Sequence, residues 1–468
     1  MFSYRDGKRG RLQEKQGGGK RLRGPVILPT VVFETPFLYT LPLFPAILDP
    51  MKTDHKNLRA FHFSAFRSLF AARFLTVLGN GIAPIALAFA VLDIGGSVSD
   101  LGVVVASRSI FNVLFLLLGG VLADRYSRSR VLVSSSLVAA ISQAIVAWSV
   151  LDGSATVIGL ALLGALNGAA AGIALPASSA LIPQTVPART LREANAFLQA
   201  GIYGGTVIGA SLGGILISAV GPGWGLAIDA LGFAAAAPLY YFIRVTPRDL
   251  GSTQSNILQD LKEGWREFAS RAWVWAIVVQ FTIINAAFSG VMMVLGPVIA
   301  DASFGRAHWG MIIAAQSVGL IVGSSLALRW RPRRDLFIGV LLVSFCALPP
   351  FMLSQLASTP WLMAAFFMAG VTFGLFGVAW AQSLQTHIPP DKLARVYAYD
   401  AVGSFVAIPF GELIAGPLAI QYGTSNVLLV SAVAVVIATL GASLVPAIRR
   451  LESGAQMTSH TSARENNL

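Results

Sequence analysis

Charged residues and cysteine are scarce in this sequence. Only 12% of the 468 residues are charged, and the chain contains one cysteine. A soluble protein of this length needs more charge to cover its surface, so the composition excludes an ordinary soluble domain. A single cysteine also excludes a disulfide within the chain, and we interpret Cys346 as a buried apolar residue.

The usual signatures of energy-coupled or metal-dependent chemistry are missing as well. No glycine-rich phosphate loop ends in Lys-Ser or Lys-Thr, which excludes direct use of ATP by this chain. We therefore expect no metal, no cofactor and no enzymatic activity. All histidines lie in predicted loops or tails, which leaves no candidate metal site inside the membrane: His55, His62, His308, His387 and His460.

Apolar residues, by contrast, make up 55% of the chain, and the mean hydropathy is +0.69. In lipid, every backbone polar group must be satisfied internally, so only helices or closed barrels can span a bilayer. Barrel strands alternate polar and apolar residues, whereas the apolar runs here are continuous. The sequence therefore predicts an all-α membrane protein.

The length of these runs sets the number of spans, because a helix needs about 20 apolar residues to cross the bilayer. We predict twelve spans in two six-helix halves, which are 66–92, 99–122, 131–151, 155–181, 195–220, 223–243, 273–300, 308–328, 336–356, 360–383, 397–421 and 425–447. The corresponding domains are an N-terminal half at 51–243, a cytoplasmic linker at 244–272, a C-terminal half at 273–447 and a cytoplasmic tail at 448–468.

The first fifty residues do not fit this pattern. Residues 1–24 are basic and rich in glycine, and residues 25–50 are apolar but interrupted by six prolines, which break a helix. We interpret residues 1–50 as a disordered N-terminal extension or as sequence upstream of a true start at Met51.

The basic residues of the loops set the orientation. They collect on one side of the predicted spans, and Arg306 is the exception. Because cytoplasmic loops are enriched in Lys and Arg, both termini should be cytoplasmic, in a bacterial inner membrane. A nucleic-acid-binding protein is the rival interpretation of the formal charge of +12, but the charges are spread over many short loops. We therefore expect no nucleic-acid partner.

The two predicted halves also share short stretches of sequence. At an offset of 204 residues, the segment 122–125 aligns with 326–329, and Arg130 aligns with Arg334. At an offset of 202, Val186-Pro187 aligns with Ile388-Pro389. Nearly equal offsets at equivalent loops favour two repeated halves with a site between them, which is an architecture of secondary transporters.

The loop after the second predicted span carries a recognisable motif. The stretch from Gly120 through Asp124-Arg125 to Arg128 and Arg130 resembles the signature of the major facilitator superfamily. Two departures, Ser127 and Ser129, are common in its drug:proton exporter branch, which includes macrolide-efflux and siderophore exporters. The resemblance covers about residues 62–447 and implies that fold.

It also implies the export of a small amphipathic compound, such as a drug, an antibiotic, a siderophore or another secondary metabolite, by proton-coupled alternating access. The expected partners are that substrate, protons and the lipid bilayer, and the expected state is a monomer. The alternatives are an importer or facilitator of the same fold and a non-transporting membrane receptor.

By the same resemblance, Asp124 acts in a gate between the halves, beside Gly120, Arg125, Arg128 and Arg130. The alternative is a topological anchor, because the arginines also satisfy the positive-inside rule. We favour the gate, since an aspartate adds nothing to that rule.

Four glycines in the fifth predicted span resemble an exporter signature, although Ala210 replaces its proline. Their spacing places them on one helix face, which predicts close packing against a neighbouring helix. They are Gly205, Gly209, Gly213 and Gly214.

Ionisable residues inside predicted spans are the sharpest functional candidates, because a charge at that depth is costly and usually faces a cavity. We interpret Asp229 and Glu412 as proton carriers, since burial makes a carboxyl group easier to protonate. A structural pair is the alternative for each. Arg73 and Asp93 could extend to the membrane interfaces instead.

Arg108 could pair with a carboxylate or bind an anionic substrate, and the sequence does not choose between these roles. Other polar residues in the spans could line the cavity or form hydrogen bonds between helices. With Arg73 and Arg108, these cavity candidates are Asn112, Gln143, Asn167, Gln199, Asn285, Gln316 and Gln382.

Overall fold

A computed structural model describes residues 60–187, 190–243, 265–330 and 332–452. The predicted N-terminal extension, most of the predicted linker and most of the predicted tail lie outside these ranges. The domain boundaries therefore stay predictions. The chain divides into two units, and all that follows concerns the unit that begins at Asn57.

The first group of helices follows the predicted spans closely. Each begins and ends within about four residues of its predicted span. The helices are α2 (Ser64–Asp93), α3 (Val98–Arg125), α4 (Arg128–Asp152), α5 (Val157–Thr185), α6 (Leu191–Val220) and α7 (Pro222–Tyr241).

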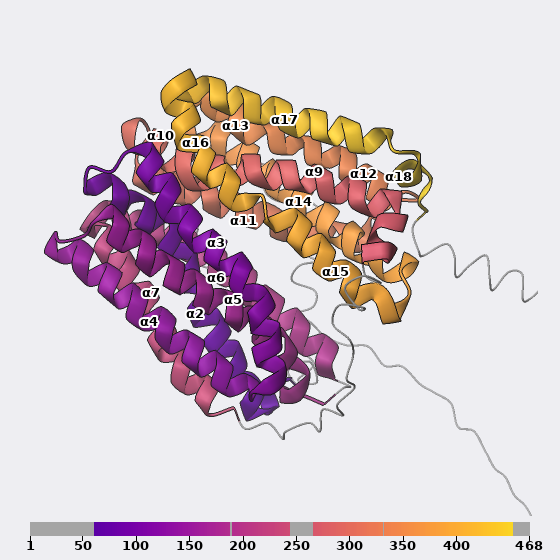
Figure 1. Cartoon of the computed structure of the whole chain (residues 1–468), viewed down its shortest axis with the longest axis horizontal. Helices are drawn as coiled ribbons and strands as arrows, with labels where there is room; N and C mark the ends of the chain where they lie inside the picture. The colour runs from indigo at the N-terminus through magenta and orange to yellow at the C-terminus, as the bar shows by residue number, and fades with distance from the viewer. Residues whose placement is uncertain (1–59, 188–189, 244–264, 331, 453–468) are drawn as a thin grey trace, which may run out of the picture. The chain divides into compact units, whose positions relative to one another are not determined.

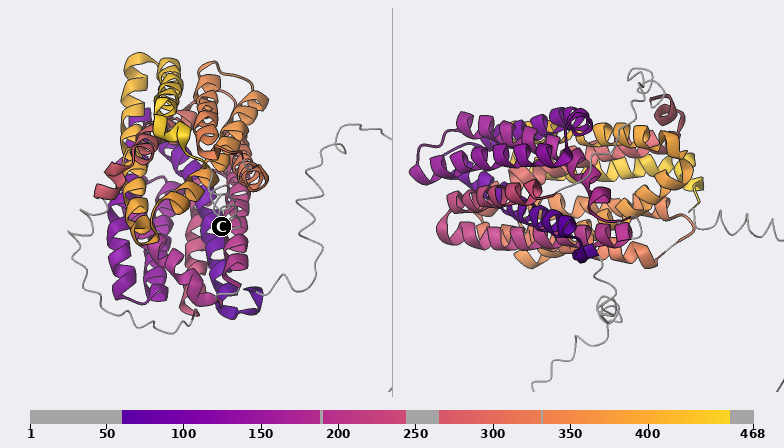
Figure 2. Two further views of the ribbon diagram at one scale, coloured as in Figure 1. Left: turned by 90° about the vertical axis from the view of Figure 1, so that its right-hand side faces the viewer. Right: turned by 90° about the horizontal axis from the view of Figure 1, so that it is seen from below.

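The second group is more often interrupted within a span. Its elements are α9 (Ala272–Ser289), η4 (Gly290–Leu295), α10 (Gly296–Ala302), α11 (Arg306–Arg329), α12 (Asp335–Leu342), η5 (Val343–Ala347), α13 (Leu348–Ser354), α14 (Thr359–His387), α15 (Pro390–Phe405), α16 (Ile408–Tyr422), α17 (Thr424–Leu444) and the short α18 (Pro446–Arg450). Pro409 lies in the first turn of α16, where its missing N–H interrupts no helical hydrogen bond. Figures 1 and 2 show the helices of each group lying side by side.

Among the described residues, eleven helical stretches are long and apolar enough to cross a membrane. The remaining predicted span is α7, which is 20 residues long but carries Asp229 in its interior. The structure therefore confirms the helical membrane architecture, whereas the count of twelve spans depends on how α7 is assigned. Large apolar side chains on the outside of the bundle agree with a lipid environment, and Trp148 and Ile158 are more than 70% exposed.

The predicted repeat is visible where the helices end. α3 ends at Arg125 and α11 at Arg329, an offset of 204, while α5 and α14 end at Thr185 and His387, an offset of 202. In each half these two helices form the most extensive packing pair. The two aligned sequence stretches therefore mark equivalent helix ends.

Glycines explain the closeness of both pairs. A Cβ atom on Gly168 of α5 would lie 2.1 Å from the carbonyl oxygen of Arg108 in α3. A Cβ atom on Gly370 of α14 would lie 2.0 Å from the carbonyl oxygen of Gln316 in α11. Only a residue without Cβ permits this approach of two helix backbones.

The two halves meet mainly through α6 with α11 and through α3 with α16. Less extensive contacts join α3 to η4 and α2 to both η4 and α10. Gly214 of α6 faces Gly310 of α11 so closely that a Cβ atom on Gly214 would lie 2.8 Å from the Cα atom of Gly310. We call the region where α2 ends and α11 begins the paired end of the molecule.

Candidate functional site

A cavity of about 250 Å³ lies between the two halves. Helices α2, α3, α4 and α5 form its wall on the side of the first half, and α9, η4 and α16 close it from the second half. Leu87, Val105, Val146, Leu160 and Met293 make most of the wall apolar. A few polar side chains converge on the same space, which is the usual composition of a small-molecule site.

Arg108 of α3 is the basic residue of this cavity, and neutral amides hold it. Its Nε donates to Oδ1 of Asn167 at 3.1 Å, and its Nη2 donates to Oδ1 of Asn80 at 3.1 Å. Asn80 in turn donates to the carbonyl oxygen of Thr76 at 2.8 Å, which fixes the orientation of its amide. The guanidinium is therefore positioned by helices α2 and α5.

Glu412 of α16 is the acidic residue of the cavity and is 2% exposed. Ser289 of α9 donates to its Oε1 at 2.6 Å, and Ser109 of α3 lies close to the same carboxyl group. Its Oε2 has no hydrogen-bond partner among the described residues. A glycine allows α16 to approach α3 here, since a Cβ atom on Gly102 would lie 2.5 Å from the Glu412 carbonyl oxygen.

Asp229 of α7 lies one layer behind the cavity and is fully buried. Gln143, which lines the cavity, donates to its Oδ2 at 2.6 Å. Gly79 of α2 leaves room for the other oxygen, because a Cβ atom at that position would lie 2.3 Å from Oδ1. Gln143 thus links the cavity to a second buried carboxyl group.

An ion pair joins the halves at the paired end. Arg306, at the start of α11, donates from Nη1 to Oδ2 of Asp93, at the end of α2, at 2.9 Å. Its Nε donates to Oδ1 of Asp301 at 2.7 Å, and its guanidinium lies 4.8 Å from the centre of the Phe89 ring. Asp93 therefore binds the other half of the molecule, a role that its position at a helix end did not reveal.

The four glycines of α6 pack against two different helices rather than one. Gly205, Gly209 and Gly213 face α2, and Gly214 faces α11. The closest approach is at Gly209, where a Cβ atom would lie 2.3 Å from the Leu78 carbonyl oxygen.

Of the nine residues predicted to line a cavity, Arg108, Gln143 and Asn167 line this one. The remaining six do not. Asn285 donates to the carbonyl oxygen of Ser404 at 2.9 Å, and Gln199 is exposed. The other four, half-buried in their helices, are Arg73, Asn112, Gln316 and Gln382.

Of the loop signature, the side chains of Gly120, Asp124 and Arg125 lie outside the described part of the structure. Arg128 is half-buried at the start of α4, and Arg130 is exposed two residues later.

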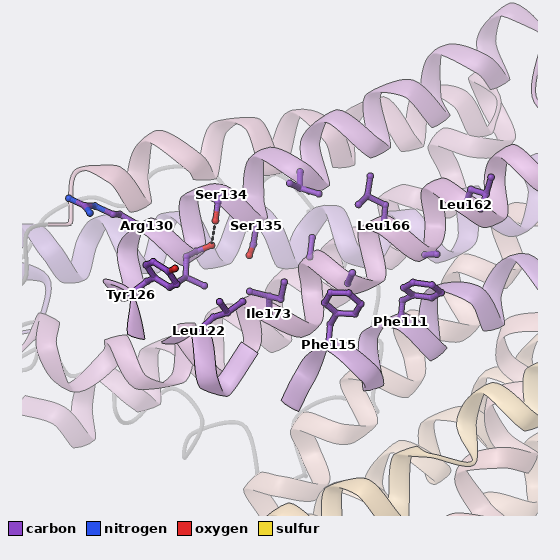
Figure 3. A pocket seen from close by; sticks show the side chains of 15 residues that line it. Phe111, Phe115, Leu122, Tyr126, Arg130, Ser134, Ser135, Leu162, Leu166 and Ile173 are labelled. Carbon is purple, nitrogen blue, oxygen red and sulfur yellow. Dashed lines mark hydrogen bonds between the residues drawn. The ribbon is translucent and has the colours of Figure 1, made fainter. Parts of the chain in front are cut away.

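Arg130 lies at the end of a hollow of about 720 Å³ on the outer face of α3, α4 and α5. Figure 3 shows Arg130 and Tyr126 at one end of this hollow and Phe111 and Leu162 at the other. Its walls are apolar along most of their length, which agrees with contact with lipid chains rather than with a polar ligand.

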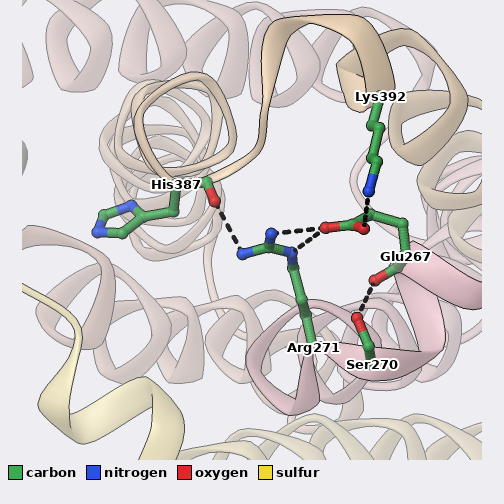
Figure 4. Close-up of polar contacts among 5 residues, drawn as sticks. All are labelled: Glu267, Ser270, Arg271, His387 and Lys392. Atoms are coloured by element: carbon green, nitrogen blue, oxygen red, sulfur yellow. Dashed lines mark hydrogen bonds and ion pairs between the residues drawn. The ribbon is translucent and has the colours of Figure 1, made fainter.

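A cluster of charges binds the start of α9 to the end of α14 and the start of α15 (Figure 4). Arg271 donates from Nε to Oε1 of Glu267 at 2.9 Å and from Nη1 to the carbonyl oxygen of His387 at 2.8 Å. Lys392 donates to Oε2 of Glu267 at 2.9 Å. Hydrogen bonds from Lys392 and Arg271 hold the pKa of Glu267 below its ordinary value.

Sequence reasoning missed three polar residues of the site. Asn80, Ser109 and Ser289 surround Arg108 and Glu412, yet a single serine or asparagine in a membrane helix has no distinctive pattern. Asn80 had one available signal, since it lies between Gly79 and Gly81, two glycines that allow close helix approach.

Fold and cavity together define a multi-pass membrane protein with two helical halves around a polar internal site. The sequence model of the Major Facilitator Superfamily matches residues 69–412, and the chain belongs to this family. It is thus a transporter rather than an enzyme. The chain is 27% identical over 345 residues to the enterobactin exporter EntS of Escherichia coli O139:H28 (strain E24377A / ETEC). That alignment covers 71% of this chain and 80% of EntS, and EntS of Shigella boydii serotype 18 matches equally well.

Solved structures of transporters share the fold. The nucleoside transporter NupG matches with a TM-score of 0.67 at 15% identity, over 83% of this chain and 99% of NupG. A bacterial homologue of the lysosomal transporter Spinster, in an inward-facing and unoccupied conformation, gives 0.63 at 15% identity, over 82% and 96%. The D-xylose-proton symporter gives 0.62 at 16% identity, over 81% and 95%.

Proposed function

We propose that the chain exports a small amphipathic compound across the bacterial cytoplasmic membrane by proton-coupled alternating access. One observation carries this proposal, namely the cavity between the halves, to which the first half contributes Arg108 and the second half Glu412. A site shared by two halves can be exposed to either side of the membrane when the halves rock against each other.

The contacts at the paired end define what must move. The ion pair of Arg306 with Asp93 and the packing of Gly214 on Gly310 hold the halves together there. In the predicted orientation this end faces outward, and both termini face the cytoplasm. Release of substrate to the outside then requires these contacts to break.

In this proposal the two buried carboxyl groups carry the protons. Glu412 faces the cavity with one unpartnered oxygen, and Asp229 connects to the cavity through Gln143. A group that can lose its charge is better suited to such a buried place than a permanent anion. Protons that enter from outside would reach Glu412 first and drive the return of the emptied site.

Outward direction is supported by the likeness to the enterobactin exporter EntS. Structural neighbours include the D-xylose-proton symporter, so the fold is compatible with import, and an importer or facilitator is the second candidate. We further propose that the protein acts as a monomer. The loop signature around Asp124 is proposed to form the cytoplasmic gate.

Flux in a bacterial strain that lacks its own efflux pumps tests this function. Cells that express the full chain would be loaded with ethidium, erythromycin or a catecholate siderophore, and retention would be followed with and without a protonophore. The expected result is faster loss of at least one compound, abolished by the protonophore and by Glu412→Gln. The matched control is Glu452→Gln, since Glu452 is exposed near the end of the described chain.

The pattern of results separates the candidates. Loss that persists with the protonophore would leave a facilitator, and protonophore-sensitive accumulation would indicate an importer. Binding of a compound without flux in either direction would indicate a receptor. Unchanged export by Glu412→Gln would overturn the role of Glu412 as proton carrier.

A further inference from the structure

Arg108 carries a partly buried positive charge that no carboxylate of the described residues neutralises by direct contact. Its hydrogen bonds go to the amide oxygens of Asn80 and Asn167, and none of the ion pairs found in the described part of the chain includes it. Asp229 and Glu412 are near enough to act on it through space, but each accepts its hydrogen bond from a neutral donor, Gln143 or Ser289.

Such an arrangement is costly unless something completes it. A positive charge that has lost part of its water and has no counter-ion in contact is costly, and arginines in such places are normally held directly by carboxylates or phosphates. The amides of Asn80 and Asn167 orient the guanidinium but supply no opposite charge. The site therefore orients the Arg108 guanidinium but leaves it without a negatively charged hydrogen-bond partner.

A second observation points to a ligand at the same place. Asn167 is 2% exposed and lines the cavity, and its Nδ2 has no hydrogen-bond partner among the described residues. Its Oδ1 is already taken by Arg108. The unpartnered amide N–H groups and the guanidinium thus belong to one hydrogen-bonded unit at the cavity wall.

We propose that Arg108 and Asn167 together bind an oxyanion of the substrate, so that the transported compound is a small amphipathic organic acid. This rests on the proposed function and names its substrate class. A carboxylate accepts from guanidinium and amide donors at once, and the apolar wall contacts the body of the molecule. The cavity volume of about 250 Å³ favours a compact acid, since ligand pockets usually measure roughly 300–1,000 Å³.

The charge of the substrate also agrees with outward transport. A membrane potential that is negative inside favours the exit of an anion by about 2.3 kcal/mol per 100 mV. The positive charge of Arg108 in the cavity offsets the negative charge of the substrate while the substrate is inside the membrane. The apolar wall alone would offer an anion no such compensation.

Ligand-induced thermal stabilisation of the purified full-length protein tests the proposal without requiring flux. The probes are three acids, each paired with its neutral methyl ester: 4-hydroxybenzoate, indole-3-acetate and octanoate. We expect at least one acid to bind at least about tenfold more tightly than its ester, the difference expected from a hydrogen-bonded charge. Arg108→Gln should remove this preference, whereas Arg108→Lys should retain part of it and the exposed control Arg450→Gln all of it.

A second variant covers the case in which Arg108→Gln fails to fold. Asn167→Asp gives Arg108 an internal carboxylate partner and should abolish the preference for acids while leaving the guanidinium in place. Equal binding of every acid and its ester by the unaltered protein would overturn the proposal, and so would an acid preference that survives Arg108→Gln or Asn167→Asp. Acid binding without proton-dependent export would refute the proposed function alone, and export without acid preference would refute this inference alone.

Discussion

The two halves of the molecule share one backbone scaffold and differ in the chemistry they place on it. In both, a glycine of one helix lies against a carbonyl oxygen of its partner, at Arg108 in the first half and at Gln316 in the second. The first half builds a polar network around a guanidinium, whereas a buried polar contact in the second half is the neutral pair of Gln280 and Thr439. The helix packing is therefore repeated in the two halves, whereas the polar residues of the site differ between them.

The largest expected loss of stability comes from removing a donor in the network of the first half. Gln143→Leu removes the donor to Asp229, and an unsatisfied buried carboxyl group costs up to about 3 kcal/mol. Gln280→Leu removes one neutral hydrogen bond and should cost about 1 kcal/mol. Denaturation of both variants in detergent measures the difference, and Gln199→Leu, at an exposed position, is the control. Equal losses at Gln143 and Gln280 would contradict the contrast between the halves.

The shared scaffold predicts equal effects in the two halves. Gly168→Ala and Gly370→Ala each force a Cβ atom against a backbone carbonyl, and overpacking of this kind costs about 1–3 kcal/mol. Gly377→Ala in α14 meets no neighbour within 4 Å and should be neutral or slightly stabilising. Thermal unfolding of the three variants is the measurement. If only one of Gly168→Ala and Gly370→Ala lowered the stability, the packing of α3 with α5 and that of α11 with α14 would not be equivalent.

A smaller effect is expected where the halves meet. Asp93→Asn weakens the contact of α2 with Arg306, and a partly exposed ion pair is worth up to about 1 kcal/mol. A change of that size shifts a conformational equilibrium about fivefold, which can be measured as faster labelling from outside of a cysteine placed by Met293→Cys. Asp301→Asn acts within one half only and should leave the labelling rate unchanged.

The smallest effect concerns Glu267 and depends on pH. Because its folded-state pKa lies below the ordinary value, its ion pairs stabilise the protein above the unfolded-state pKa and lose that contribution as pH falls through the folded-state pKa. Glu267→Gln should therefore destabilise by about 0.5 kcal/mol at pH 7, with the difference from the unaltered protein shrinking toward pH 4. A difference that is constant between pH 7 and pH 4 would show that packing, not charge, is lost.

Hydropathy and glycine spacing are local patterns in the sequence, and the features of the fold that depend on them could be predicted. The ends of the helices and the close packing of Gly209 on α2 follow from such local patterns. The interruption at η4 follows from them only in part: Gly290 begins it and Pro297, which lacks an N–H, lies two residues after its end. That segment packs against α3 and α16, and tertiary contacts of this kind leave no trace in hydropathy.

The site was only partly predictable for a related reason. Arg108, Asp229 and Glu412 attract attention because a charge inside an apolar run is rare. Which of them share a cavity depends on how helices far apart in the chain pack, and α3 meets α16 across some 300 residues. For the same reason the partner of Asp93 could not be found from its own helix.

Reversible cross-linking across the cavity tests the central claim most directly. Ser109 of α3 and Ser289 of α9 both lie beside Glu412, so a short bis-thiosulfonate should link them in a Ser109→Cys, Ser289→Cys protein with Cys346→Ser. Our account predicts that the link stops export and that reduction restores it. A control link within the second half, between Ser354→Cys and Ser425→Cys, should leave export intact, because the Ser425 hydroxyl lies 3.0 Å from the Ser354 carbonyl oxygen. Full export by the protein linked across the cavity would contradict a transport path between the two halves.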